Sequence, residues 1–161
     1  SHVVGVTTSG DQTCWGESPT ELQCWGVPST GTYSKVVAGD LHSCALGTDD
    51  SLTCWGNDSN GQVGDTPTTG RFIDVAALGK TTCAIDDLGA IQCWGRNSYN
   101  LVSDKPTGSF VALDAGAFHI CAIADDQSVH CWGIDDGSLE DTGQITPAAS
   151  ATNALSISSG P

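Results

Sequence analysis

The sequence predicts an all-β fold assembled from about four copies of one small antiparallel unit, each closed by its own disulfide. One observation is that all eight cysteines of the 161 residues fall into pairs ten positions apart. The second is that the later cysteine of each pair opens a Cys-Trp-Gly triplet, so a single unit recurs along the chain. The pairs are Cys14/Cys24, Cys44/Cys54, Cys83/Cys93 and Cys121/Cys131.

The first unit, over residues 1–30, is compressed. Residues 2–16 match residues 42–56 in register, which places Val4 where a unit normally has its first cysteine and leaves Cys14 without its usual partner. A further Cys-Trp-Gly triplet begins at Cys24 with no outer segment before it. Terminal repeats are often atypical because they cap an array. We therefore expect Cys14 and Cys24 to pair with each other.

The later units share short apolar strands separated by tight turns. Each has an aromatic residue eleven positions before its first cysteine, namely Tyr33, Phe72 and Phe110. An Asp-rich piece lies between the two cysteines, where it favours a turn. A hairpin that folds midway sets the two cysteines across from each other, at the separation that a disulfide needs. Closing so short a loop stabilises each hairpin by about 2–3 kcal/mol. The alternative, a metal site shared between copies, lacks the close Cys pairs that such sites use.

The array of about four repeats ends near residue 141, and residues 142–161 lose the periodicity. This segment is rich in Ala, Ser and Thr and contains an isolated apolar stretch at Leu155-Ser156-Ile157. It is predicted to be a tail, a linker or a single added strand that closes the array.

The copy that begins at Val37 carries the most complete motif. It comprises Val37-Ala38-Gly39, His42, Cys44-Ala45-Leu46, Asp49-Asp50, Trp55-Gly56-Asn57 and Gly61-Gln62-Val63-Gly64. This pattern resembles the repeat of the regulator of chromosome condensation family over about residues 2–141. Its short period is similar to that of the family's secreted bacterial branch, which includes β-lactamase inhibitor protein II. The resemblance implies a β-propeller. Because the family's propellers usually close with seven repeats, four of them predict a partial propeller, which belongs to a longer protein or pairs with a second copy to complete a ring, or else an open solenoid.

The amino-acid composition limits the classes of partner and the cellular compartment that we expect for this protein. The chain has 5 Lys and Arg against 19 Asp and Glu, for a net charge of -14. Nucleic acids and anionic membranes are therefore excluded as expected partners, since both attract clustered cations. No apolar run is long enough to insert in a membrane. Evenly spaced cysteines without a Cys-x₂-Cys pair predict an oxidising compartment, and hence a secreted, extracellular protein.

No residue pattern indicates catalysis, a metal or a cofactor. The sequence lacks a Gly-x-Ser-x-Gly elbow, a Cys/His nucleophile arrangement and a phosphate loop. Repeated Asp-Asp pairs are expected as turn formers, because they lack the spacing of a calcium loop. His2, His42 and His119 recur at one repeat position, where we expect packing and hydrogen bonding. We predict a protein that is not an enzyme.

The leading functional prediction is a recognition module that binds a protein or a surface glycan through loops on one face. The predicted loops are Asn57–Asp65, Asn97–Asp104 and Ile134–Asp141. Their candidate binding residues are Asn57, Asp58, Asn60, Asn97, Tyr99, Asn100, Asp135 and Asp136, with Trp15 as a candidate exposed aromatic. The alternative is a structural subunit of an extracellular assembly that self-associates through blade edges, and a homo-oligomer is its expected form.

Overall fold

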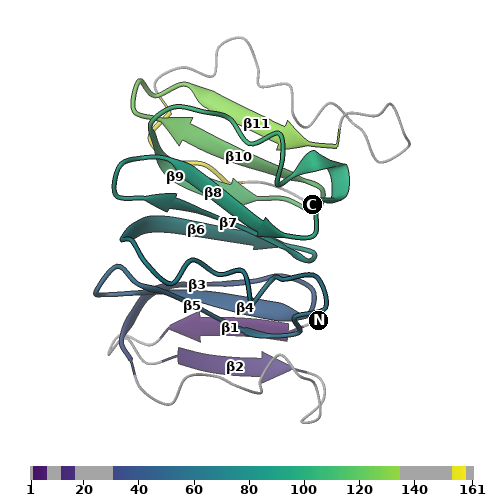
Figure 1. Cartoon of the computed structure of the whole chain (residues 1–161). Helices are drawn as coiled ribbons and strands as arrows, with labels where there is room; N and C mark the ends of the chain where they lie inside the picture. The colour runs from purple at the N-terminus through teal and green to yellow at the C-terminus, as the bar shows by residue number, and fades with distance from the viewer. Residues whose placement is uncertain (1, 7–11, 17–30, 135–153, 159–161) are drawn as a thin grey trace.

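Our computed structural model describes residues 2–6, 12–16, 31–134 and 154–158. These residues form four antiparallel sheets stacked one on another, with one short 3-10 turn, η2 (Ser98–Asn100) (Figure 1). The first sheet contains β1 (His2–Val6) and β2 (Gln12–Gly16). Blade 1 contains β3 (Tyr33–Ala38), β4 (His42–Gly47) and β5 (Leu52–Gly56). Blade 2 contains β6 (Phe72–Leu78), β7 (Thr81–Asp86) and β8 (Ile91–Gly95). Blade 3 contains β9 (Phe110–Ala115), β10 (His119–Ala124) and β11 (Val129–Gly133). The predicted all-β fold of small antiparallel blades is confirmed.

Each blade runs from an inner strand through a middle strand to an outer strand. The inner strands of successive blades pack on each other, β3 against β6 and β6 against β9. Each new inner strand also contacts the middle strand of the blade before it, as β6 contacts β4 and β9 contacts β7. The turns after the inner strands therefore lie close together at one end of the stack.

The core lies between the blades, because each of blades 1 to 3 buries both of its faces. In blade 2, Phe72, Val75, Ala84 and Trp94 pack on blade 1, whereas Ala76, Cys83 and Ile85 pack on blade 3. A strand covered on both faces needs a continuous apolar run, and small residues at some positions let the sheets approach. This explains why every residue of β4 and β10 is buried. The three tryptophans of blades 1 to 3 are likewise buried.

The predicted disulfides within repeats are confirmed in blades 1 to 3. Cys44–Cys54, Cys83–Cys93 and Cys121–Cys131 each join directly opposed residues of the middle and outer strands. Their Cα separations of 4.1, 4.1 and 4.0 Å are those of the closely spaced, non-hydrogen-bonded type of antiparallel pair. The predicted Cys14–Cys24 pair lies outside the described residues.

Removing one of these disulfides should lower the stability of the fold. The double variant Cys83→Ala/Cys93→Ala should lower the free energy of unfolding by about 2–3 kcal/mol, because the unfolded chain regains the freedom of a ten-residue loop. Urea titration followed by tryptophan fluorescence measures this loss. The equivalent double variant at Cys121 and Cys131 serves as the comparison, and the two losses should agree. An unchanged midpoint in both would contradict the stabilising role.

One carboxylate, that of Asp74 on β6, joins all three blades. Its Oδ1 atom lies 2.6 Å from Lys35 Nζ of blade 1 and accepts a 2.9 Å hydrogen bond from the backbone N–H of Val75. Its Oδ2 atom accepts a 2.7 Å hydrogen bond from the backbone N–H of Leu113 in blade 3. Only 14% of the Asp74 side chain is exposed, so its partners replace most of the water that a carboxylate would otherwise bind.

The two-stranded first sheet has the register of a middle strand and an outer strand. His2 opposes Gly16 and Val4 opposes Cys14, just as His42 opposes Gly56 and Cys44 opposes Cys54 in blade 1. Among the described residues, no strand occupies the inner position beside β1. The structure describes no helix that is both long and apolar enough to span a membrane.

Candidate recognition groove at the inner turns

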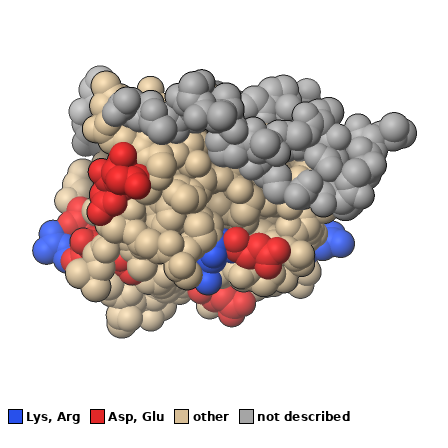
Figure 2. Space-filling model, turned by 90° about the horizontal axis from the view of Figure 1, so that it is seen from above, with Lys and Arg blue, Asp and Glu red and all other residues tan. Residues whose placement is uncertain are grey.

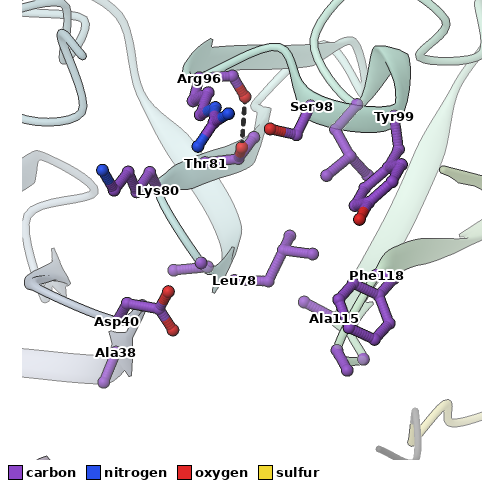
Figure 3. Close-up of a pocket in the computed structure, with 16 residues that line it drawn as sticks. Ala38, Asp40, Leu78, Lys80, Thr81, Arg96, Ser98, Tyr99, Ala115 and Phe118 are labelled. Atoms are coloured by element: carbon purple, nitrogen blue, oxygen red, sulfur yellow. Dashed lines mark hydrogen bonds between the residues drawn. The ribbon is translucent and has the colours of Figure 1, made fainter. Parts of the chain in front are cut away.

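The turns that follow the inner strands enclose a groove of about 650 Å³ (Figure 3). Its walls come from all three blades. They consist of the turns at residues 38–40, 77–81 and 115–118, together with the segment around η2 at residues 96–101. Because the groove spans the junctions between blades, its shape depends on how the sheets stack.

The glycine of each Cys-Trp-Gly triplet fixes the position of one turn. Gly56, Gly95 and Gly133 all have positive φ values, of 107°, 94° and 131°. A Cβ atom at these positions would lie 2.7, 2.3 and 2.5 Å from the carbonyl oxygens of Leu41, Lys80 and Phe118, respectively. The residue after each glycine donates its backbone N–H to that same oxygen, over 2.8, 2.9 and 3.1 Å. Glycine is therefore required for the outer strand to bind the inner turn this closely.

Charged side chains gather at one end of the groove. Lys80 and Asp40 lie on one side, and Arg96 lies above them (Figure 3). The backbone holds these residues in place, because Asp40 N–H donates to Gly79 O over 2.7 Å and Thr81 Oγ1 donates to Arg96 O over 2.6 Å.

Lys80 and Arg96 are two of the three cationic residues, with Lys105, that form no ion pair with a described residue of this acidic chain. Lys35 and Arg71 form ion pairs with Asp74 and Asp50. Within the part of the chain that the structure describes, Lys80 and Arg96 form no ion pair. Figure 2 shows acidic side chains in separate groups over a largely uncharged surface, with few basic ones between them. The groove thus brings two available cations together where the rest of the protein is acidic.

Aromatic rings occupy the other end of the groove. Tyr99 and Phe118 face each other there (Figure 3), edge to face, with ring centroids 5.7 Å apart. The Tyr99 side chain sits on a strained backbone, because Tyr99 and Asn100 have φ values of 54° and 57°. The Asn97 side chain supports this backbone by accepting hydrogen bonds from Val102 N–H and Ser103 N–H, over 2.8 and 3.1 Å. The aromatic end is therefore formed before any partner binds.

The floor of the groove is apolar and anchored to the core. Leu78 and Leu101 are 7% and 2% exposed. Trp132 Nε1 donates a 2.9 Å hydrogen bond to Leu101 O, and Trp94 Nε1 donates a 3.2 Å bond to the equivalent carbonyl of Gln62 in the preceding loop. Each tryptophan therefore links its own blade, by one hydrogen bond, to the loop that follows the preceding blade.

Of the loop residues that the sequence singles out, Tyr99 lines the groove. Asn57 and Asp58 shape their own loop instead. Asn57 Oδ1 accepts bonds from Ser59 N–H and Gln62 Nε2, and Asp58 Oδ1 accepts bonds from Val63 N–H and Gly64 N–H. These backbone bonds, chiefly from Gly64, lower the pKa of Asp58.

The remaining candidates divide between exposed loop positions and undescribed ones. Asn60 and Asn100 are exposed beside these loops. Asp135, Asp136 and the side chain of Trp15 lie outside the described residues.

Two of the recurring histidines, His42 and His119, are buried, and the side chain of His2 lies outside the described residues. His42 Nε2 lies 2.7 Å from Thr82 Oγ1 of the next blade, which couples blades 1 and 2. Burial lowers the pKa of His119, although the charge of Asp114 opposes the change. Among the residues described, no cluster of His, Cys, Asp or Glu side chains could hold a metal ion.

The sequence analysis missed Asp40, Lys80, Arg96 and Phe118, which come from turns and strand ends rather than from the predicted loops. A signal was present in the repeats themselves. The turn position before the middle strand carries Leu41, Lys80 and Phe118 in successive blades, whereas the Cys-Ala-Leu or Cys-Ala-Ile segment inside the middle strand is kept. Variation at one turn position of an otherwise regular repeat indicates a position that the fold leaves unconstrained.

Two segments of the chain, residues 33–62 and 110–137, match the regulator of chromosome condensation (RCC1) repeat. The chain therefore carries repeats of this type. No curated protein matches the sequence.

Several solved propeller structures are similar to the fold. The CRINKLY WD40 ectodomain of the Arabidopsis thaliana receptor kinase ACR4 has a TM-score of 0.66 and 26% identity, over 99% of this chain and 53% of the ectodomain. The ectodomain of the Physcomitrella patens receptor kinase CR4 has the same TM-score and identity, over 83% and 38%. Prp20p of Saccharomyces cerevisiae, at 17% identity and a TM-score of 0.64 over 82% and 43%, shares the fold. Our chain thus spans about half the length of the first of these structures.

Proposed function

We propose that this protein is a non-catalytic recognition module that binds a segment of another protein in the groove between its inner turns. The observation that carries the proposal is the pairing of two available cations, Lys80 and Arg96, with the Tyr99–Phe118 aromatic pair in one preformed cavity. Aromatic residues and arginine dominate the energetics of protein interfaces. A rigid aromatic end also reduces the ordering cost of binding.

The groove favours a particular partner chemistry. A carboxylate would bind at the charged end, where Arg96 offers several donors and Lys80 a point charge, and where these two cations outnumber the single Asp40 carboxylate. An aliphatic or aromatic side chain would bury its surface against Leu78 and the aromatic pair. We therefore propose a partner segment in which an acidic residue lies close to an apolar one. This chemistry favours a peptide over a neutral glycan.

An extracellular setting is the second part of the proposal. Three disulfides support it, because such bonds persist in oxidising compartments. The similarity to receptor-kinase ectodomains supports it as well. Cell fractionation with an antibody to the native protein tests the extracellular setting, and assignment to the secreted bacterial branch is a separate part of the proposal.

The groove proposal predicts selective loss of binding on charge reversal. A random heptapeptide array probed with the folded chain should enrich peptides that place Asp or Glu near Phe, Tyr, Trp or Leu. Lys80→Glu and Arg96→Glu should each weaken the best of these peptides at least about 10-fold, equivalent to about 1.4 kcal/mol, because each replaces an attraction by a repulsion. Fluorescence anisotropy measures the affinities.

A matched control comes from Lys105, which does not line the groove. Lys105→Glu changes the net charge by the same amount and should alter the affinity less than about 2-fold, since salt screens a charge that lies outside the groove. Equal losses in all three variants would mean that only net charge matters. An array without enrichment would reject the groove as a peptide site.

A further inference from the structure

The final described segment, residues 154–158, is attached to blade 3 by a bond that recurs between blades. Ala154 N–H donates a 3.2 Å hydrogen bond to Gln127 O at the hairpin tip of blade 3. Phe72 N–H binds Asp50 O in the same way, and Phe110 N–H binds Gly89 O, both over 2.9 Å. The three acceptors occupy one repeat position, and all have positive φ values (67°, 84° and 68°). Phe72 and Phe110 are the first residues of inner strands, so Ala154 occupies the place where an inner strand begins.

The sequence from Ala154 continues in the register of an inner strand. Residues 154–160 align with residues 33–39 and 110–116, and a glycine ends all three. The second position is exposed throughout, with Ile73 at 47%, Val111 at 53% and Leu155 at 88%. The fourth position is buried in Val75 and Leu113, at 0% and 2% exposure, and partly buried in Ile157. The aperiodic composition of the surrounding residues conceals this match.

A blade with this inner strand would still need a middle strand and an outer strand. Among the described residues, no strand pairs with residues 154–158. At the other end of the stack, β1 and β2 have the middle and outer register, and none of the described residues forms an inner strand beside them. Figure 1 shows the yellow segment beside blade 3 and the purple hairpin on the far side of blade 1. Within the described residues, each of these two parts supplies the strand position that the other lacks.

We propose that residues 154–158 form the inner strand of a blade whose middle and outer strands are the β1–β2 hairpin of a second copy of this chain. The copies then associate head to tail, and blade 3 of one continues into the first sheet of the next. The open edge of β1 favours this addition, because no described residue pairs as a strand with its backbone N–H and C=O groups. The association uses strands outside the groove, so it stands or falls independently of the groove proposal.

The register of the complete blades specifies the new contacts. In them the first cysteine opposes the fifth residue of the inner strand, as Cys44 opposes Val37 and Cys121 opposes Asp114. Ser158 should therefore oppose Val4 of the second copy. Because Val4 and Cys14 correspond to the non-hydrogen-bonded pair of Cys44 and Cys54, the N–H and C=O of Val4 point to the open edge. Val4 and Ser158 would then exchange two backbone hydrogen bonds.

Two proline variants test this pairing, since proline lacks the N–H that each side donates. We expect the wild-type chain to form oligomers that grow with concentration in sedimentation velocity. Val4→Pro leaves only the 154–158 end competent, and Ser158→Pro leaves only the β1–β2 end competent. Each variant alone should be monomeric, whereas an equimolar mixture should form a 1:1 dimer that does not grow further.

Alanine variants at the same positions control for the side chains. Val4→Ala and Ser158→Ala keep the N–H groups and should oligomerise as the wild type does. Near-ultraviolet circular dichroism checks that the proline variants keep blades 1 to 3 folded. A wild-type chain that stays monomeric up to its solubility limit would overturn the proposal. So would proline variants that still oligomerise alone, or a mixture of them that remains monomeric.

Discussion

Gly95→Ala should destabilise the protein by about 3 kcal/mol or more, and it should also distort the groove. The new methyl group would lie 2.3 Å from Lys80 O, so the backbone of the turn that carries Lys80 would have to move. The φ value of 94° adds strain of about 1–3 kcal/mol for any residue with a Cβ atom. Urea denaturation of the folded variant measures the loss of stability.

Gly70→Ala separates these two effects. Gly70 has a similar φ of 102°, yet a Cβ atom there would meet the Phe72 ring only at 3.8 Å, an ordinary contact. We expect a loss of about 1 kcal/mol at Gly70 from strain alone, and a clearly larger loss at Gly95. Similar losses at the two positions would show that the contact with Lys80 O has little importance. The groove would then not depend on the glycine of the Cys-Trp-Gly triplet.

Asp74→Ala should lower the free energy of unfolding by about 3 kcal/mol. The change removes the partner of Lys35 Nζ and leaves the backbone N–H groups of Val75 and Leu113 without their acceptor. An unsatisfied buried donor costs about 1–3 kcal/mol, and these donors belong to different blades. Because the carboxylate joins three blades, the unfolding transition should also broaden. Thermal and urea unfolding test both effects.

Asp86 offers a matched control. Its carboxylate also accepts three hydrogen bonds, from Leu88 N–H, Ala90 N–H and Gln92 Nε2, but all of them lie within one hairpin. Asp86→Ala should cost about 1 kcal/mol, because water can replace these bonds at an exposed tip. Asp74→Asn should fall between the two alanine variants, since its amide keeps one oxygen acceptor. If the two alanine variants lost equal stability, the link between blades would carry no extra energy.

Much of the fold follows from residues visible in the sequence. The ten-residue spacing of the cysteines places Cys83 opposite Cys93, because period-two strands around a central turn allow few other registers. The aromatic residues that open the inner strands and the tryptophans of the triplets were also recognisable as core residues, since they recur once per unit. Local patterns of this kind are sufficient when each unit repeats the same contacts with its neighbour.

The groove could not be predicted in the same way. Asp40, Lys80, Arg96 and Phe118 come from three blades, and only the stacking of the sheets brings them together. The sequence drew attention to Asn57, Asp58 and Asn97 because polar loop residues resemble binding residues. In the structure their side chains accept backbone hydrogen bonds and support the loops. A polar residue that shapes a loop and one that binds a partner have the same composition and differ only in where the side chain points.

The covalent staples also determine how this protein would respond to mechanical tension. The disulfides of blades 1 to 3 lie within single sheets, so a pulling force could separate one sheet from the next without breaking a covalent bond. Each blade that unfolds would keep its ten-residue disulfide loop closed, and the loop holds back about 35 Å of extended chain. The molecule would therefore lengthen in short, similar steps and stop well before full extension. In an extracellular setting, such a chain would extend under load only as far as its disulfide loops allow.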